Sequence, residues 1–481
     1  MTDRPRGVAT ASPNPGAGVA AEGQGGRWLL LAIAIGTTLA PLNSTMIAVA
    51  LPEIQRSFSV SVTATAWLVT LYLVAMAVAQ PIGGRLGDMY GRRPVYLGGL
   101  AWFGLASVGC AIAPNLGLLI LFRTQQALAG AMSFPNGAAI VRDAVPHERR
   151  GSAYGTIGLA TGLAAAAGPP IGGVLVNSFG WAATFWANVP VVGVALLLGW
   201  QSLPRRSAGP GPRPPFDLAG SSLFAAMLGS AVVIPTLLRF NQPVIAALSA
   251  AAAVVTGWVF VTRELRTPAP VIDLRLFKRA HFTAACMSIG LSNMVMYTTL
   301  LAIPLYLEHS RGYGVQFSGM VLAALSVLAA FWGPLGGRWT DHRGRWLPAV
   351  TGGAAVLAGA ILLAASIRGS STGWVVVSLA IMGIGIGLAG APVQTAAVEA
   401  VPGDKTGSAA GIYSTSRYIG SVIGSSVLAV VFLDQASEED TDRFFALFVG
   451  LAIVAVFGLL ANARIAAIDA SSPQAPGHRV S

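Results

Sequence analysis

Two arginines lie inside otherwise apolar stretches of the sequence and are the strongest candidates for chemistry. Arg123 lies in the segment 121–131, three residues before Gln126, and Arg417 lies in the segment 407–433. A guanidinium inside an apolar helix needs a polar partner or water, so such a residue normally faces an internal pathway. The alternative is a side chain that extends to a nearby interface. We favour the pathway for both arginines, because a charge inside a membrane span is functional by default.

The acidic residues avoid the apolar stretches. None of the 19 Asp and Glu residues lies in the middle of an apolar run, and Glu53 and Glu308 lie at run ends. A pathway lined by arginines and by polar residues such as Asn43, Gln126 and Tyr297 should favour neutral, weakly anionic or zwitterionic amphiphiles, because permanent cations seek carboxylates or aromatic cages. An amide cannot carry a proton, so we expect proton coupling to pass through Glu53 or Glu308.

A glycine-rich charged loop occurs twice in the chain. Residues 84–93 read Gly-Arg-Leu-Gly-Asp-Met-Tyr-Gly-Arg-Arg, and a related sequence follows at 337–345, offset by 253. A second match, between 145–155 and 401–411, has an offset of 256. Two matches at nearly the same offset predict two parallel halves. The acid in each loop is placed to meet the positive N-terminus of another helix. The positions of interest in the two loops are Gly84, Asp88, Gly91, Arg92, Arg93 and Asp341.

Small residues and prolines dominate the segment 152–176. Glycines at such spacing let helices touch backbone to backbone, and proline bends a helix by freeing a carbonyl group. We therefore expect a tightly packed, kinked helix here. The positions concerned are Gly158, Gly162, Gly168, Pro169, Gly172 and Gly173.

The composition is that of a membrane protein. Of the 481 residues, 54% are hydrophobic and only 10% are charged, whereas soluble domains carry roughly 25% charged residues. This excludes a soluble enzyme, a disordered chain and a disulfide-bonded secreted domain. The net charge of +11 comes from short clusters between apolar runs and not from a basic patch with interleaved aromatic residues, so no nucleic-acid partner is expected. No cofactor, metal cluster or phosphate-binding loop is expected either.

Fourteen apolar runs between residues 28 and 464 are each long enough to cross a bilayer. Twenty-three of the 30 Lys and Arg residues fall in loops on one side of this topology. The positive-inside rule then predicts that both termini are cytoplasmic. We expect a disordered tail (1–26), a six-helix bundle (27–203), a Pro-rich linker (204–216), an inserted helix pair with its following loop (217–280), a second six-helix bundle (281–465) and a C-terminal tail (466–481).

Taken together, these motifs resemble the major facilitator superfamily, and specifically its 14-helix drug:proton antiporter branch. The resemblance covers about residues 28–465. It implies that the loop 84–93 latches the two halves on the cytoplasmic side, with Asp88 as the latch acid, and that the glycines of 158–173 form an antiporter motif. It also implies a role for Arg123 in proton handling or in orienting the binding site. The branch usually has an acid at the position of Asn43, and this chain departs from that pattern.

We therefore expect a secondary active transporter in the cell membrane that exports small amphiphilic compounds, such as drugs, antibiotics or metabolites, by alternating access and in exchange for protons. The alternative is a facilitative uniporter or an uptake symporter for a neutral or anionic solute, which the absence of the first-span acid favours. We expect a monomer. A membrane enzyme and a channel are disfavoured, because neither a catalytic cluster nor a selectivity-filter loop is present.

Overall fold

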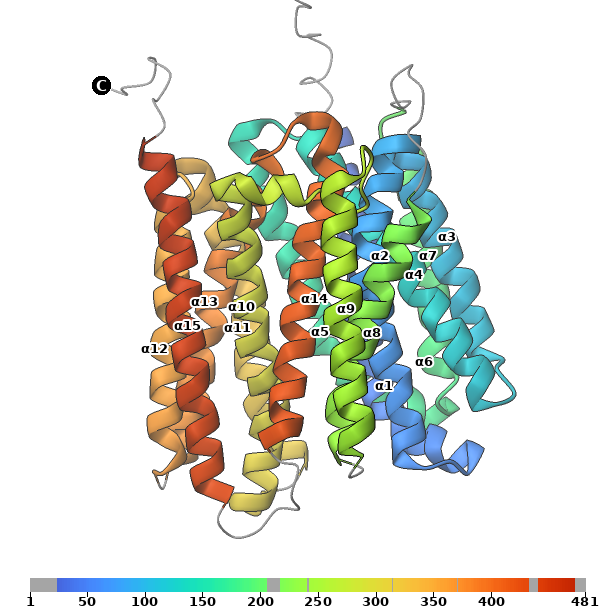
Figure 1. Cartoon of the computed structure of the whole chain (residues 1–481), viewed down its shortest axis with the longest axis vertical. Helices are drawn as coiled ribbons and strands as arrows, with labels where there is room; N and C mark the ends of the chain where they lie inside the picture. Colours follow the sequence, from blue (N-terminus) through green and yellow to red (C-terminus); the bar gives the residue numbers. More distant parts are fainter. Residues whose placement is uncertain are drawn as a thin grey trace, which may run out of the picture.

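The computed structural model describes residues 24–205, 217–239, 242–313, 315–369, 371–431 and 440–471, and these residues form long helices that run roughly parallel (Figure 1). Most of the expected tails and most of the expected linker lie outside the described residues, whereas residues 24–26 and 466–471, which were expected in the tails, belong to the first and last helices. The first half consists of α1 (Gln24–Phe58), α2 (Val62–Tyr90), α3 (Arg92–Ala111), α4 (Leu116–Ala144), α5 (Arg150–Phe179), and α6 (Ala183–Trp186) with α7 (Asn188–Ser202).

The helix pair α8 (Leu218–Arg239) and α9 (Pro243–Arg266) follows. The second half consists of α10 (Ala280–Leu305), α11 (Val315–Arg343), α12 (Trp346–Ile367), α13 (Thr372–Glu399), α14 (Thr406–Val431) and α15 (Asp440–Ser471). Because α6 and α7 together make one span, the predicted fourteen spans are confirmed, in an all-helical fold. Eleven of them are long and apolar enough to cross a membrane by composition alone. The remaining three are α4, α8 and α14, and α4 and α14 carry the two arginines.

Local sequence explains where the helices begin and turn. The side chain of Asn115 accepts a hydrogen bond from the Leu118 amide at 2.9 Å and so caps α4. In both copies of the charged loop the chain turns at a glycine with positive φ, 96° at Gly91 and 76° at Gly344. Residues with a Cβ rarely adopt this conformation, so the glycines at this position permit the turn.

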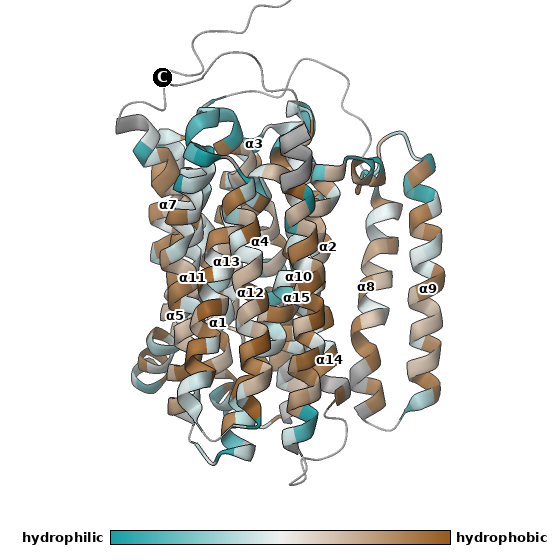
Figure 2. Cartoon of the chain, turned by 90° about the vertical axis from the view of Figure 1, so that its left-hand side faces the viewer, coloured by the Kyte–Doolittle hydropathy of each residue, from teal (hydrophilic) through white to brown (hydrophobic). Residues whose placement is uncertain are grey.

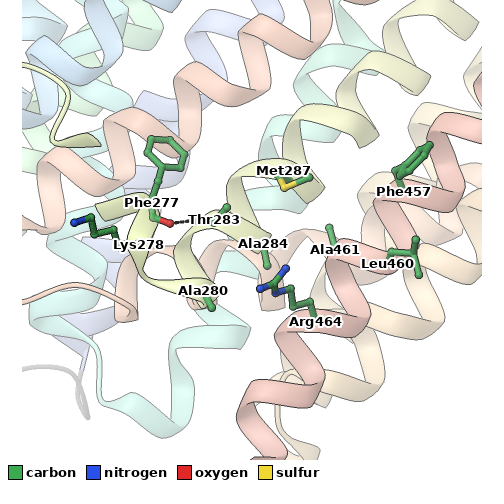
Figure 3. Close-up of a pocket in the computed structure, with 10 residues that line it drawn as sticks. All are labelled: Phe277, Lys278, Ala280, Thr283, Ala284, Met287, Phe457, Leu460, Ala461 and Arg464. Atoms are coloured by element: carbon green, nitrogen blue, oxygen red, sulfur yellow. Dashed lines mark hydrogen bonds between the residues drawn. The ribbon is translucent and has the colours of Figure 1, made fainter. Parts of the chain in front are cut away.

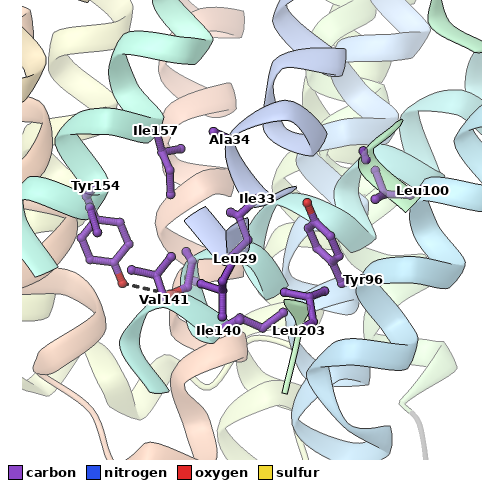
Figure 4. Packing of buried hydrophobic residues seen from close by; sticks show 14 of the residues in the cluster. Leu29, Ile33, Ala34, Tyr96, Leu100, Ile140, Val141, Tyr154, Ile157 and Leu203 are labelled. Atoms are coloured by element: carbon purple, nitrogen blue, oxygen red, sulfur yellow. Dashed lines mark hydrogen bonds between the residues drawn. The ribbon is translucent and has the colours of Figure 1, made fainter. Parts of the chain in front are cut away.

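Each half has its own buried core. In the first half, aliphatic residues of α1, α3, α4 and α5 surround Tyr96 and Tyr154 (Figure 4). The hydroxyl groups of these tyrosines donate to backbone carbonyls, Tyr96 to Ala32 at 3.0 Å and Tyr154 to Ala138 at 2.9 Å. A second cluster fills the other half between α10, α11, α12, α13 and α15. The halves meet where α5 lies along α11 and α2 lies along α14.

The pair α8–α9 lies at the edge of the bundle (Figure 2). Helix α8 contacts α2 and α14, whereas α9 contacts mainly α8. Large apolar side chains on α9 face outward, with Val254 72% and Trp258 69% exposed. Such a surface suits lipid and not water. We call the end of the bundle that holds Asp88 and Asp341 the motif end, and the opposite end the far end.

Candidate functional site

Asp88 joins the two halves at the motif end. It lies in the last turn of α2, and its carboxylate accepts hydrogen bonds from the amides of Gly407 at 2.9 Å and Ser408 at 2.7 Å, at the start of α14. The Ser408 hydroxyl donates a third bond, at 3.0 Å. The first amides of a helix have no partner within the helix and lie at the positive end of its dipole, so they suit a carboxylate. Asp88 therefore binds the N-terminus of a helix that belongs to the other half.

Asp341 makes the reciprocal contact. It lies in α11 of the second half and accepts hydrogen bonds from the amides of Gly151 at 2.7 Å and Ser152 at 2.8 Å, at the start of α5. The Ser152 hydroxyl also donates to this carboxylate. The two contacts are related by the internal repeat, and both are formed in this structure. The halves are therefore joined at the motif end by two equivalent contacts.

Glycines allow the backbones to touch at the same place. A Cβ added to Gly84 would lie 1.9 Å from the Gly407 carbonyl oxygen, and a Cβ added to Gly337 would lie 2.3 Å from the Gly151 carbonyl oxygen. Neither contact can accommodate a methyl group without a shift of the backbone. The closed arrangement therefore depends on glycine in both halves.

Charged side chains surround these contacts and cross between the halves. Arg92 binds Asp143 of its own half and donates to the Gly403 carbonyl oxygen of the other at 2.6 Å. Arg142 donates to the Val401 carbonyl oxygen at 2.8 Å. Arg93 differs from its neighbour, because it donates to the Trp200 carbonyl oxygen within its own half. Of the two arginines expected at the gate, the structure thus places only Arg92 between the halves.

Glu399 is the centre of a second set of charges at the motif end. Its carboxylate oxygens lie 2.9 Å from Arg150 Nη1, 3.2 Å from His147 Nε2 and 3.4 Å from Arg345 Nη1. Arg150 and His147 belong to the first half, and Arg345 belongs to the second. The sequence analysis did not identify this network. A signal was present, because Asp143 and Glu399 are both acids and are separated by the repeat offset of 256.

A buried polar network lies in the first half near Arg123, whose side chain is 1% exposed. Arg123 Nη1 and Asn43 Nδ2 each donate to Gln126 Oε1 at 2.5 Å, and Gln126 Nε2 donates to Ser107 Oγ at 2.7 Å. The guanidinium carbon also lies 4.0 Å from the centre of the Tyr72 ring. Arg123 is therefore held by neutral partners and does not extend to an interface.

Arg417 lies on α14 of the second half and faces aromatic rings. Its guanidinium carbon lies 5.1 Å from the centre of the Phe134 ring on α4 and 5.8 Å from that of Tyr413. Tyr297 of α10 interacts electrostatically with both Arg417 and Tyr72. Residues of α2, α4, α10 and α14 therefore meet here, with two cations and several aromatic rings. Among the described residues, no acid forms an ion pair with either arginine.

The acids expected to carry protons lie at the far end. Glu53 belongs to α1, and its Oε2 atom is buried without a hydrogen-bond partner among the described residues. Glu308 lies in a π-helical turn (Tyr306–Ser310) that continues α10. The two positions are offset by 255, so the repeat relates them. The structure thus places them apart from the motif-end contacts, in equivalent positions of the two halves.

The glycines of α5 have different neighbours. A Cβ on Gly162 would lie 2.7 Å from the Cβ of Ala330 in the other half, and a Cβ on Gly168 would lie 1.8 Å from Thr45 Oγ1 of α1. Gly172 approaches Met46 of α1, with 3.1 Å from an added Cβ to the Met46 Cα. An added Cβ on Gly158 or on Gly173 would have nothing within 4 Å. Pro169 lies inside α5. Only part of the motif therefore makes close contacts.

One cavity in the described part of the chain lies on the outside of the bundle. It has a volume of about 310 Å³ and lies between the motif ends of α10 and α15, where Lys278, Met287, Phe457 and Arg464 contribute to its wall (Figure 3). Three of its lining side chains, Met287, Phe457 and Leu460, are more than half exposed. This is a groove on the outer surface of the bundle and not a pathway between the halves. No group of three or more potential metal ligands occurs in the described part of the chain.

Comparisons with known proteins agree with this architecture. Residues 33–425 match the family model described as Major Facilitator Superfamily. An uncharacterized MFS-type transporter of Bacillus subtilis, YvkA, is 36% identical over 91% of this chain and 95% of its own length. The multidrug resistance protein Stp of Mycobacterium tuberculosis is 33% identical over 84% of this chain and 75% of its own length.

The crystal structure of the human organic anion transporter MFSD10 has the same fold. It superimposes with a TM-score of 0.66 at 15% sequence identity, covering 91% of this chain and 100% of that one. The family match, the relatives and the paired six-helix halves lead to one assignment. This chain belongs to the major facilitator superfamily of membrane transporters.

Proposed function

We propose that this transporter exports small amphiphilic compounds across the cell membrane in exchange for protons, with the motif end and both termini in the cytoplasm. The observation that carries the proposal is the pair of reciprocal contacts made by Asp88 and Asp341. They close one end of the interface between the halves through bonds that can break without unfolding either half. Such a reversible closure is what alternating access requires.

The direction of opening follows from the same contacts. With the motif end closed, a compound held between the halves can leave only toward the far end. Opening the motif end separates two carboxylates from two helix N-termini, and each such interaction is worth about 0.3–1 kcal/mol, or about 2 kcal/mol where it is partly buried. This cost is small enough to be reversed by binding of a substrate or a proton. The cycle therefore needs no ATP.

The substrate class follows from the charges near the middle of the bundle. Arg123 and Arg417 supply two positive charges, and the aromatic rings of Tyr72, Phe134 and Tyr413 supply flat apolar surfaces. A compound with a flat apolar body and a neutral or negatively charged polar group complements this lining. The multidrug resistance function in the name of the relative Stp supports export as the direction.

Protons would enter through Glu53 and Glu308. Both side chains are carboxyl groups that can bind and release a proton, and Glu53 Oε2 is buried without a hydrogen-bond partner among the described residues. The second candidate function is a carrier uncoupled from protons, which Asn43 favours because it binds Gln126 as a neutral amide. The two functions differ in whether transport dissipates a pH gradient.

Everted vesicles with an acidic interior provide the test. Neutral, anionic and cationic amphiphiles are added in turn, and the pH gradient is compared with that of vesicles lacking the protein. We expect neutral or anionic amphiphiles to collapse part of the gradient as they enter. If labelled compound crosses while the gradient stays intact, proton exchange is wrong and the uncoupled carrier is supported. If no amphiphile crosses, the proposed substrate class is wrong.

A further inference from the structure

Two acids of the inserted helix pair are buried side by side at the motif end. Asp217 directly precedes α8, Glu264 lies in the last turn of α9, and their side chains are 7% and 1% exposed. Neither belongs to the contacts between the halves. Acidic side chains are rarely buried so completely unless each charge has a partner.

Only one oxygen of each carboxyl group has a hydrogen-bond donor. Asp217 Oδ1 accepts from the Gly220 amide at 2.9 Å and from Arg263 Nη2 at 2.8 Å. Glu264 Oε2 accepts from the Ile272 amide at 2.9 Å. The other two oxygens, Asp217 Oδ2 and Glu264 Oε1, are buried without a donor among the described residues.

These two unpaired oxygens lie against the same glycine. A Cβ added to Gly220 would lie 2.6 Å from Asp217 Oδ2 and 2.3 Å from Glu264 Oε1. Two ionised carboxylates have only acceptors to offer, so a proton on one of them would supply the donor that both oxygens lack. A shared proton also removes the repulsion between two adjacent negative charges.

The proton belongs to Glu264. Burial raises the pKa of Asp217, but the hydrogen bonds from Arg263 and the Gly220 amide and the charge of Arg263 outweigh it and leave that pKa below its usual value. Asp217 thus stays ionised and accepts, while Glu264 donates.

Charged groups around the pair balance the remaining negative charge. Their positive charges make the site more favourable for a proton than for a metal ion. Arg263 binds Asp217 directly, and Arg85 of α2 interacts electrostatically with both acids. Cations so close to the pair oppose the binding of a further cation. The charged groups that act on the pair are Arg263 of α9 and Arg85 of α2. Arg85 also interacts with Asp88 of α2 and with Asp273, which precedes the turn Leu274–Lys278. Asp273 in turn binds Lys405 of the turn Gly403–Lys405 at 2.8 Å.

Arg85 connects this pair to the contact between the halves. It follows Gly84 in the charged loop, is 9% exposed, and interacts electrostatically with Glu264, Asp217 and Asp88. Its Nε atom has no hydrogen-bond partner among the described residues. Loss of the shared proton would leave Glu264 negatively charged beside Arg85. The guanidinium would then be drawn toward Glu264 and away from Asp88.

We propose that Asp217 and Glu264 form a proton-binding site between the inserted helix pair and α2, and that Arg85 transmits its occupancy to the Asp88 contact. The site requires neither substrate nor transport, so it stands or falls separately from the proposed function. It gives the inserted pair a role that its lipid-exposed position does not otherwise provide.

Infrared spectroscopy of the purified protein tests the shared proton. The C=O stretch of protonated carboxyl groups is recorded at neutral pH for the wild type, Glu264→Gln and Asp404→Asn. Glutamine retains the bond to Ile272 and can donate to Asp217, so Glu264→Gln should fold normally. Asp404 is an exposed acid at the same end and serves as the matched control. We expect Glu264→Gln to lose one band that Asp404→Asn retains. Identical spectra in this region would overturn the proposal.

A labelling experiment tests the link to the gate. Ala410 of α14 is 1% exposed and packs against the core of the first half, so a cysteine at this position becomes reactive only when the motif end opens. Cys110 and Cys286 are both buried and are replaced by alanine. Rates are divided by those of a free thiol at the same pH, because the reactive thiolate itself becomes more abundant as the pH rises. We expect this normalised labelling of Ala410→Cys to accelerate severalfold as the pH rises, and to lose most of the acceleration with Glu264→Gln. The same acceleration with and without Glu264 would overturn the transmission through Arg85.

Discussion

Asp88 and Asp341 occupy repeat-related positions, and each binds two consecutive amides at the start of a helix in the opposite half. Because the contact is duplicated, either acid alone can hold part of the interface shut. The two contacts lie on different helix pairs, α2 with α14 and α11 with α5. Opening the motif end requires both to break.

The duplication predicts a graded response to removal of charge. Asp88→Asn or Asp341→Asn keeps one acceptor oxygen but loses the charge that the helix dipole favours, at a cost of about 1 kcal/mol. Since 1.4 kcal/mol corresponds to a tenfold change in an equilibrium constant, each variant should label Ala410→Cys about fivefold faster than the parent. The double variant should label faster than either. A single variant with unchanged labelling would show that its aspartate does not hold the gate.

Close backbone contact predicts a strong effect of one methyl group. Gly84→Ala places a Cβ 1.9 Å from the Gly407 carbonyl oxygen, so the motif end cannot close fully, and export should fall by at least tenfold. Gly98→Ala is the matched control, because nothing lies within 4 Å of its added Cβ. Transport of a fluorescent amphiphile by cells that express equal amounts of each variant measures the difference. Equal loss in both variants would mean that the contact at Gly84 is not responsible.

The same reasoning separates the glycines within α5. Gly162→Ala and Gly168→Ala introduce contacts of 2.7 and 1.8 Å, whereas Gly158→Ala and Gly173→Ala meet nothing within 4 Å. We expect the first two to lose transport and the second two to retain most of it. Thermal unfolding in detergent should show a lower midpoint for Gly168→Ala, because its contact with Thr45 lies within one half. A uniform response of all four would contradict these assigned contacts.

The internal repeat made much of the contact between the halves at the motif end predictable from sequence. The charged loop occurs twice, so Asp88 and Asp341 could be identified together with the turns at Gly91 and Gly344. Arg92 and Arg93 could not be distinguished, because neighbours on a helix point about 100° apart and the direction of α3 fixes which one reaches the other half. The pair Asp217–Glu264 carries no sequence signal, since packing of α9 against α8 creates it.

The two far-end acids are predicted to act on coupling and not on binding. In Glu53→Gln and Glu308→Gln the side chain can no longer exchange a proton, so substrate should still equilibrate across the membrane while it ceases to collapse a pH gradient. Asp442→Asn is the control, because Asp442 is an exposed acid at the far end that binds Arg368. Parallel measurements of substrate flux and internal pH in everted vesicles separate the two effects. Gradient collapse that persists in the double variant would show that protons take another route.

The buried network around Arg123 leads to a prediction about substrate charge. Asn43 Nδ2 and Arg123 Nη1 share one acceptor, Gln126 Oε1. Asn43→Asp replaces the amide donor with a carboxylate, which would repel that oxygen and turn toward the Arg123 guanidinium, whose Nε has no partner among the described residues. The positive charge of the region would then be largely neutralised. We expect Asn43→Asp to weaken transport of anionic amphiphiles by roughly tenfold and to improve transport of cationic ones.

Asn43→Ser is the control for that experiment, because it removes the amide without adding charge. It should reduce transport of anionic and cationic amphiphiles alike, since the loss of one bond to Gln126 does not depend on substrate charge. Initial rates for a matched anionic and cationic dye pair give the ratio directly. If Asn43→Asp and Asn43→Ser change this ratio equally, the charge of Arg123 does not select the substrate, and the aromatic rings of Tyr72 and Phe134 must determine what is carried.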